Sequence, residues 1–250
     1  MTIQEVSEKK LQRIRALLAQ AEDKGVTEEE AAAFHAKAFA MMAQYGIERA
    51  MIESSRPDVS IKPEMRTIVI NPPWALDSVT LLSNLASALR CKAVTLGKDK
   101  NTKTHSVRVF GYASDLDRLD VLYTSLLIQM HSGVLSAEVP YWESTKSFRK
   151  GWLLGFLSEV ISRVRKAEQY ARKQAEGTSS ESGETSTGTE LVLVSREKAV
   201  AALVSSEFPS LRKVGIGTTR SHTGYETGLR DGRNADIGQA RMSGRRAIDR

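Results

Sequence analysis

The chain has 250 residues but only one cysteine, Cys91, and four histidines. A single cysteine excludes an intramolecular disulfide framework and is typical of a protein from the reducing cytoplasm. No run of about 18 apolar residues is present, so we expect neither a transmembrane helix nor a membrane partner. The first ten residues lack the apolar region of a signal peptide, which also favours a cytoplasmic location.

Motifs of catalysis and cofactor binding are missing as well. The sequence has no Gly-x-Ser-x-Gly elbow, no nucleotide-binding fingerprint and no Glu-x-x-His pair. His35, His105, His131 and His222 fall on different expected elements, so we predict no metal site and no cofactor. Cys91 ends an apolar segment and is expected to be a small buried residue. No catalytic residue is assigned, and the pattern favours a protein that is not an enzyme.

Residues 1–50 carry the clearest structural pattern, which predicts a helical hairpin module. Apolar residues recur at spacings of three and four in two segments, and Gly25 suits the cap that ends the first helix. Thr27 and Glu30 form a capping box at the start of the second helix, which Gly46 is expected to end. The expected buried residues are Leu11, Ile14, Leu17, Leu18 and Ala21, then Ala31, Phe34, Ala38, Met41, Met42 and Tyr45.

The hairpin segment resembles the domain of unknown function 2786 family, an uncharacterised module of actinobacterial and phage proteins. The matching residues are Leu11, Ile14, Leu17, Leu18, Ala21, Glu22, Thr27, Glu30, Ala31, Met42, Tyr45, Gly46 and Ile47. The resemblance implies a helical N-terminal module and a bacterial or phage origin, and it assigns no catalytic residue. Leu89–Cys91, Phe110–Gly111 and the Gly- and Arg-rich C-terminus also look like segments of related proteins.

Residues 64–176 are predicted to form an α+β core of helix, β-hairpin and helix, extended by a basic helix. In this core, helices cover one face of a small antiparallel sheet. Asp115 is expected to cap its second helix. The predicted strands are Arg66–Ile70, Cys91–Leu96 and Ser106–Gly111, and the predicted helices are Trp74–Arg90, Asp115–His131 and a long helix from Lys146.

The C-terminal part begins with a stretch that has no apolar residue. Residues 177–190 are therefore predicted to be a flexible linker, followed by a basic helical segment at 191–250. Within that segment, Leu191–Val194 is a strand candidate and Arg196–Phe208 a helix candidate.

Glycines at a spacing of four mark two of the predicted helices. Gly224, Gly228 and Gly232 would form a bare stripe on the C-terminal helix. Because each glycine costs about 1 kcal/mol of helix propensity, three of them indicate a compensating close contact. Gly151 and Gly155 leave a similar smooth surface on the helix that follows Lys146. We predict that these two glycine surfaces pack together.

Positive charge is concentrated in the C-terminal half of the chain. The net charge is +6 and the isoelectric point is about 9.4. Residues 146–173 hold eight basic and two acidic residues, and residues 196–250 hold eleven basic and six acidic residues. Arginine suits phosphate because its planar fork donates two parallel hydrogen bonds. The candidate nucleic-acid-binding residues are Arg163, Arg165, Lys166, Arg230, Arg233, Arg241, Arg245 and Arg246.

Three hypotheses about function follow. The leading one is a cytoplasmic, non-enzymatic accessory protein of a bacterium or phage that binds nucleic acid through its basic C-terminal surface. The alternative is a protein-interaction module, such as a phage or host regulatory factor, and the third is an enzyme without a sequence-visible motif. Lys98, Lys100 and Lys103, in the turn of the predicted hairpin, fit a phosphate contact, but the pattern favours a solvated turn.

Overall fold

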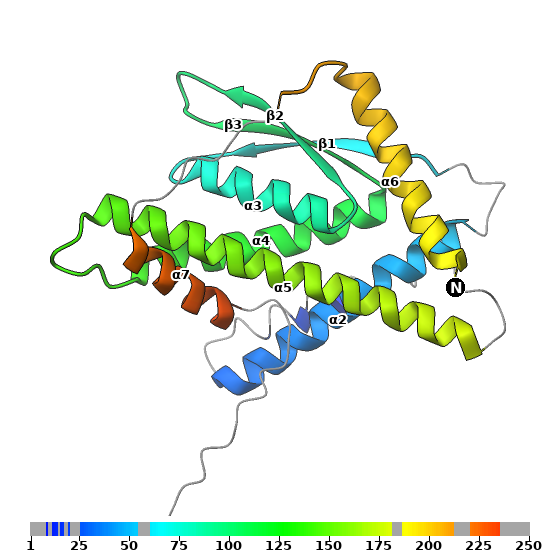
Figure 1. The fold of residues 1–250 in the computed structure, drawn as a ribbon, viewed down its shortest axis with the longest axis horizontal. Coiled ribbons are helices and arrows are strands. Elements are labelled where there is room, and N and C mark those ends of the chain that lie inside the picture. The colour runs from blue at the N-terminus through cyan, green and yellow to red at the C-terminus, as the bar shows by residue number, and fades with distance from the viewer. Residues whose placement is uncertain are drawn as a thin grey trace, which may run out of the picture. The chain divides into compact units, whose positions relative to one another are not determined.

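The computed structural model describes residues 26–54, 61–181, 187–212 and 221–235, together with residues 9, 12–14, 16–17 and 20. These parts contain helices and one small antiparallel sheet, so the predicted α+β class is confirmed (Figure 1). The chain divides into two compact units, one of Met1–Ala43 with Asp236–Arg250 and one of Gln44–Ala235. We call Gln44–Ala235 the larger unit.

The start of helix α2 (Glu28–Ser54) confirms the predicted capping box. The backbone amide of Thr27 donates to the Glu30 carboxylate at 3.1 Å, and the amide of Glu30 donates to the Thr27 hydroxyl at 3.3 Å. Before this point, the described residues of the first helix are helical, with Ile14 and Leu17 buried as predicted. Gly25, the other predicted cap, lies outside the described residues.

Helix α2 does not end at Gly46, so that prediction is wrong. The helix continues to Ser54, and Gly46 lies inside it against another part of the larger unit. A Cβ placed on Gly46 would overlap with the guanidinium of Arg118. The glycine is therefore required because a side chain at this position would exclude Arg118, and not because the chain reverses.

The sheet has the order β1-β3-β2, with β1 (Glu64–Ile70) and β2 (Lys92–Lys98) both antiparallel to β3 (His105–Gly111). The third strand predicted at Arg66–Ile70 is therefore confirmed, and it pairs with β3. Side chains alternate between faces along a strand, so Val107 and Val109 point to one face while Phe110 points to the other. All three are fully buried, which shows that both faces of the sheet are covered at β3.

Helices cover both faces, where the sequence predicted one. Helices α3 (Ala75–Ala88) and α4 (Ala113–Ser136) lie on the same side of the sheet (Figure 1). Helix α6 (Thr187–Glu207) packs Val200 and Val204 against Val94 and Phe110 on the opposite face.

The strand predicted at Leu191–Val194 is wrong, because these residues belong to α6. The buried residues Leu193, Arg196, Val200 and Val204 recur at spacings of three and four, which is the period of a helix. The apolar run Leu191–Val194 is the start of this buried helix face. A run of four apolar residues fits either a strand or a buried helix, so the sequence pattern alone could not decide between them.

Helix α5 (Thr145–Glu181) is longer than predicted, and it enters the stretch predicted to be a linker. Helix α6 enters the same stretch from the other end, since it begins at Thr187. Residues 182–186 lie outside the described residues. All residues of the predicted linker that the structure describes are therefore helical.

Helix α7 (His222–Asn234) lies alongside α5, and the glycines of the two helices meet as predicted (Figure 1). A Cβ placed on Gly151 would lie 2.6 Å from the carbonyl oxygen of Ser221. A Cβ on Gly155 would overlap with the carbonyl oxygen of Tyr225. No side chain fits at these positions, so the two backbones touch directly.

The glycines of α7 lie equally close to the backbone of α5. A Cβ on Gly224 would overlap with the carbonyl of Phe148, and one on Gly228 with the carbonyl of Trp152. Farther along, Gly232 faces Phe156 and Glu159. Since residue numbers rise together along both helices, α5 and α7 run in the same direction.

Polar contacts hold α7 at its start and along its length. The Ser221 hydroxyl accepts a hydrogen bond from the amide of Gly224 at 3.0 Å and donates one to Glu143 Oε2 at 2.6 Å. The indole nitrogen of Trp152 donates to Asp231 Oδ2 at 2.7 Å. These bonds fix the position of α7 along α5 as well as its distance from α5.

A methyl group added at Gly228 should destabilise the protein. Because the new Cβ would collide with the Trp152 carbonyl, we expect Gly228→Ala to lower the free energy of unfolding by about 2 kcal/mol. Gly188 in α6 is the control, since a Cβ there has no atom within 4 Å. Gly188→Ala should be neutral or stabilising by up to about 1 kcal/mol. Urea unfolding measures both variants, and an unchanged midpoint for Gly228→Ala would contradict the contact.

Candidate nucleic-acid interface and a buried arginine network

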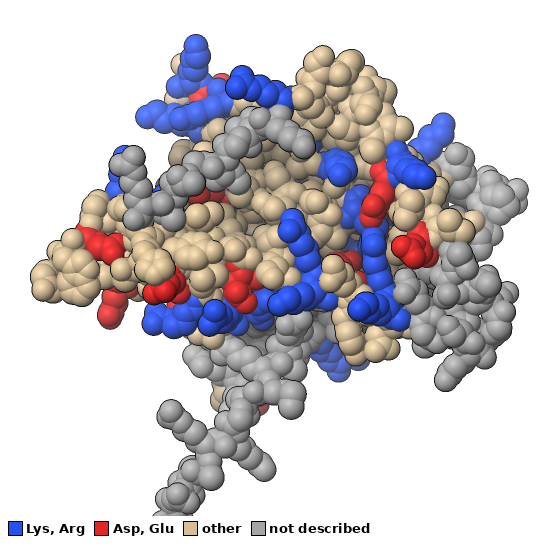
Figure 2. Space-filling model, viewed as in Figure 1, with Lys and Arg blue, Asp and Glu red and all other residues tan. Residues whose placement is uncertain are grey.

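The second half of α5 exposes a basic face. Arg165, Lys166, Tyr170 and Lys173 are all exposed. Lys166, Tyr170 and Lys173 are spaced by four and three residues and Arg165 is next to Lys166, so at 100° per residue the four fall within an arc of about 140° on one side of the helix. We call these four residues the α5 stripe. None of the exposed residues between 162 and 174 is acidic, and all of that segment is described. Figure 2 shows Lys and Arg side chains gathered over this part of α5.

The hydrogen bonds described for the stripe are with neutral groups. Arg165 Nη2 lies 3.4 Å from the amide oxygen of Asn84. The Tyr170 hydroxyl accepts a hydrogen bond from Gln174 Nε2 at 2.9 Å, and its side chain is 65% exposed. Arg172 is different because it pairs with Glu197 at 2.9 Å, and it is not part of the stripe. The structure therefore presents three cations and one aromatic ring on a single exposed face.

Arg163 was a candidate binding residue, but it faces α7. Its Nη1 donates to the carbonyl oxygen of Gly232 at 2.7 Å and also to the carbonyl oxygen of Ala235. The last carbonyls of a helix have no partner within the helix and carry partial negative charge. Arg163 therefore holds the end of α7, and we do not include it in the surface considered for binding.

The other candidates fall into two groups. Arg230 and Arg233 are exposed near the end of α7, and Arg230 Nε lies 3.4 Å from Asp231 Oδ1. The Arg163 hydrogen bonds place the end of α7 beside the part of α5 that comes just before the stripe. Arg241, Arg245 and Arg246 lie outside the described residues.

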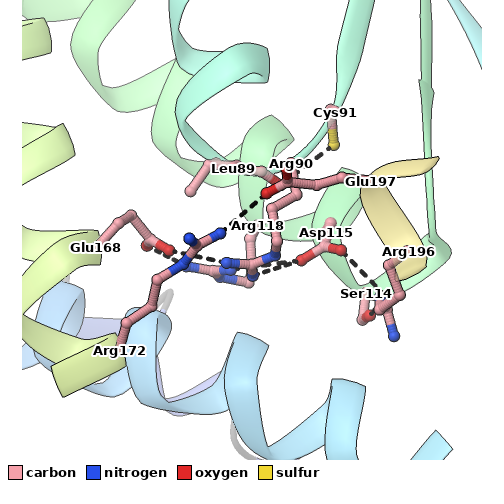
Figure 3. A network of polar contacts seen from close by, with 10 residues as sticks. All are labelled: Leu89, Arg90, Cys91, Ser114, Asp115, Arg118, Glu168, Arg172, Arg196 and Glu197. Carbon is pink, nitrogen blue, oxygen red and sulfur yellow. Dashed lines mark hydrogen bonds and ion pairs between the residues drawn. The ribbon is translucent and has the colours of Figure 1, made fainter. Parts of the chain in front are cut away.

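A second cluster of charge is buried inside the larger unit (Figure 3). Both Arg90 and Arg196 donate through Nη2 to the Asp115 carboxylate at 3.0 Å. Arg118 donates to Glu168 and also contacts Asp115 at 3.5 Å. We call Arg90, Asp115, Arg118, Glu168 and Arg196 the buried arginine network. It joins the α3–β2 turn to α4, α5 and α6.

The local conformation around Arg90, Asp115 and Arg196 directs their side chains into this network. Arg90 has a φ of 63°, a left-handed conformation that is unfavourable for a residue with a side chain. Asp115 does not cap α4 as predicted, because α4 begins at Ala113 after Tyr112 and the Asp115 side chain turns inward to the guanidiniums. The Arg196 guanidinium also lies 3.8 Å from the centre of the Tyr112 ring, a cation–π geometry.

The electrostatics of the network are set by burial and pairing together. Burial alone would lower the pKa of Arg90, because it penalises the charged form. The charges of Asp115 and Glu168 outweigh this penalty, so the pKa of Arg90 is raised. The guanidinium therefore stays protonated inside the protein.

Cys91 lies next to the network and is 1% exposed, which confirms the predicted burial. Desolvation raises the pKa of Cys91 to about 12, and the charge of Asp115 adds to this effect. A protonated buried thiol is a poor nucleophile. A Cβ on Gly111 would lie 2.6 Å from the Cys91 sulfur, which explains the glycine there.

The three histidines whose side chains are described lie in different surroundings. His131 Nε2 lies 3.2 Å from the Ser78 hydroxyl, His222 pairs with Glu226 on the surface of α7, and His105 is in β3. Across the described residues, no group of three or more His, Cys, Asp or Glu side chains is arranged to hold a metal ion. None of the described helices is long and apolar enough to cross a membrane.

Removing the Asp115 carboxylate should destabilise the protein strongly. Breaking a buried ion pair on one side leaves a desolvated charge, so we expect Asp115→Ala to cost about 3–5 kcal/mol of unfolding free energy. Asp117, two residues away, is the control because its pair with Arg66 is partly exposed. Asp117→Ala should cost less than about 1 kcal/mol. Similar urea midpoints for the two variants would show that the network does not stabilise the fold.

Comparisons with known proteins identify only the N-terminal segment. Residues 9–49 match the family model described as "Protein of unknown function (DUF2786)", which confirms the resemblance read from the sequence. The match includes Gly46, the glycine against Arg118. No curated protein and no solved structure matches the chain. The similarity to DUF2786, a family of unknown function, is therefore limited to residues 9–49.

Proposed function

We propose that this protein is a non-enzymatic nucleic-acid-binding protein that uses the α5 stripe as its main contact surface. The observation that carries the proposal is the exposed face of α5, with three cations, one aromatic ring and no exposed acidic residue between 162 and 174. Cations bind the phosphate backbone, and an exposed aromatic ring stacks on unpaired bases. Arg230 and Arg233 extend the cationic surface at the end of α7.

The α5 stripe sits on a rigid support. On other sides of the same helix, α5 contacts α7 through glycines and contributes Glu168 to the buried arginine network. A helix held in this way loses little freedom when a ligand binds to its exposed face. The side chains therefore keep a fixed spacing along the helix, which favours contact with successive phosphates.

Binding of this kind has a defined salt dependence. Each phosphate neutralised releases counterions, and the slope of log K against log salt is about −0.9 per phosphate on duplex DNA. If the three cations of the stripe and the two arginines of α7 each contact one phosphate, we expect a slope of roughly −4 to −5. Affinity should then fall steeply between about 50 and 200 mM salt.

Replacing the stripe cations should weaken binding. We expect the variant Arg165→Gln, Lys166→Gln, Lys173→Gln to bind at least about tenfold more weakly and to reduce the magnitude of the salt slope by about two to three. Fluorescence anisotropy with labelled single- and double-stranded DNA and RNA measures both quantities.

The control for net charge is the variant Lys62→Gln, Lys92→Gln, Lys146→Gln, which removes three exposed lysines outside the stripe. It should bind nearly as well as the unmodified protein. Equal losses in the two variants would show that only total charge matters. No binding of the unmodified protein at low salt would overturn the proposed function.

A protein-interaction module is the second candidate, favoured by the exposed face of α4. Residues 121–137 contain no charged residue, although the chain is rich in charge. Ile128 and Leu135 are 55% and 59% exposed and lie two turns apart on the same face. An uncharged apolar helix face suits a protein partner better than phosphate. A partner that survives nuclease and high salt, but is lost in Ile128→Lys, would favour this candidate.

A further inference from the structure

The turn between β2 and β3 carries a second group of exposed cations. It projects from the sheet, and Figure 2 shows Lys and Arg side chains gathered over it. Lys98, Lys100 and Lys103 are all exposed. We call residues 98–103 the hairpin tip. Its one acidic residue is Asp99, so the tip carries a net charge of +2.

Asp99 holds the tip in a defined shape. Its Oδ1 accepts hydrogen bonds from the backbone amides of Asn101 at 2.7 Å and Thr102 at 2.8 Å. These amide bonds lower the pKa of Asp99, because they favour the charged carboxylate. The backbone of Asp99 is also bonded to Lys103 and Thr104, at 3.0 and 2.9 Å. The carboxylate is thus directed at the backbone amides of the turn.

A β-bulge sets the direction of the hairpin. The pairing of β2 with β3 shifts between Thr95 and Gly97. Gly97 has a φ of +115°, which glycine adopts readily, and nothing lies within 4 Å of a Cβ placed there. Bulges bend a strand and increase its twist. This glycine is therefore kept by backbone conformation and not by close packing.

We infer that the hairpin tip is a second phosphate-contacting site, separate from the α5 stripe, and that Asp99 is the residue that positions its lysines. This inference rests on the proposed function, since it adds a second contact site for the same ligand. Lysines contact phosphates as point charges, and Lys98, Lys100 and Lys103 lie at or beyond the last residue pair of the sheet, Lys98 and His105, where a phosphate backbone can reach them. An ordered turn loses less conformational entropy on binding than a flexible one. The solvated turn favoured from the sequence is the alternative that the test must exclude.

Substitutions at Asp99 separate shape from charge. Asp99→Ala and Asp99→Asn both raise the net charge by one, but only asparagine keeps an oxygen that can accept the two amide hydrogen bonds. If charge alone matters, both variants should bind nucleic acid more tightly. If the tip must be ordered, Asp99→Ala should bind several-fold more weakly than Asp99→Asn, measured by anisotropy with the same labelled duplex.

The lysines are tested directly by the variant Lys98→Gln, Lys100→Gln, Lys103→Gln. We expect weaker duplex binding than in the control Lys62→Gln, Lys92→Gln, Lys146→Gln, with the salt slope reduced in magnitude by about two to three. If Asp99→Ala unfolds, this lysine variant decides whether the tip contacts phosphate.

The possible outcomes distinguish this inference from the proposed function. Binding that depends on the α5 stripe but not on the tip lysines would overturn the inference and leave the function standing. Equal affinity of Asp99→Ala and Asp99→Asn would overturn the positioning role of Asp99. No binding of the unmodified protein at any salt concentration would overturn both.

Discussion

The direct backbone contact between α5 and α7 is the constraint on which the C-terminal half of the protein depends. At Gly155 and Gly228 no side chain separates the two helices, so each glycine faces a carbonyl group of the other helix. This close approach brings Asp231 within hydrogen-bond distance of the Trp152 indole. It also brings the last carbonyls of α7 to Arg163. Larger residues at these positions would separate the helices and break both contacts.

Helix α5 divides its sides among three different tasks. One side touches α7 through glycine, a second contributes Glu168 to the buried arginine network, and a third exposes the α5 stripe. Arg163 and Arg165 show how sharply the helix separates these tasks. They are two residues apart, and the 100° rotation per residue turns one toward α7 and the other toward solvent.

The parts of the fold that could be predicted from the sequence are those set by local patterns. The spacing of four in Gly151 and Gly155 and in the glycines of α7 indicated two bare helix surfaces, and the structure joins them. The capping box at Thr27 depends on two residues three apart, so it too was visible. Alternation and turn residues located the three strands of the sheet, although the same kind of pattern also predicted a strand at Leu191–Val194 that is helical.

The parts that could not be predicted depend on contacts between distant residues. Arg90, Arg118 and Arg196 are spread over about a hundred positions of the sequence. No local sequence pattern distinguishes an arginine that will be buried from one that will be exposed. From the sequence, Gly46 looks like a residue that ends a helix. Only its contact with Arg118, which is distant in the sequence, explains why a glycine is needed inside the helix. Asp115 resembles a cap for the same reason, because two of its partners, Arg90 and Arg196, come from other elements. Whether a basic residue of α5 faces solvent depends on which side of the helix it lies on and on what packs against that side. The amino-acid composition of the segment does not determine either.

Ultraviolet crosslinking of a bound oligonucleotide, followed by peptide mass spectrometry, tests the central claim most directly. The described part of the chain offers two competing exposed aromatic sites, Tyr170 in the α5 stripe and the pair Tyr141 and Trp142 in the α4–α5 loop. Tyr141 is 95% exposed and Tyr170 is 65% exposed, so accessibility alone would favour Tyr141. Our account predicts crosslinks at Tyr170, beside the cations that hold the phosphates. Crosslinks at Tyr141 and Trp142 with none at Tyr170 would contradict it.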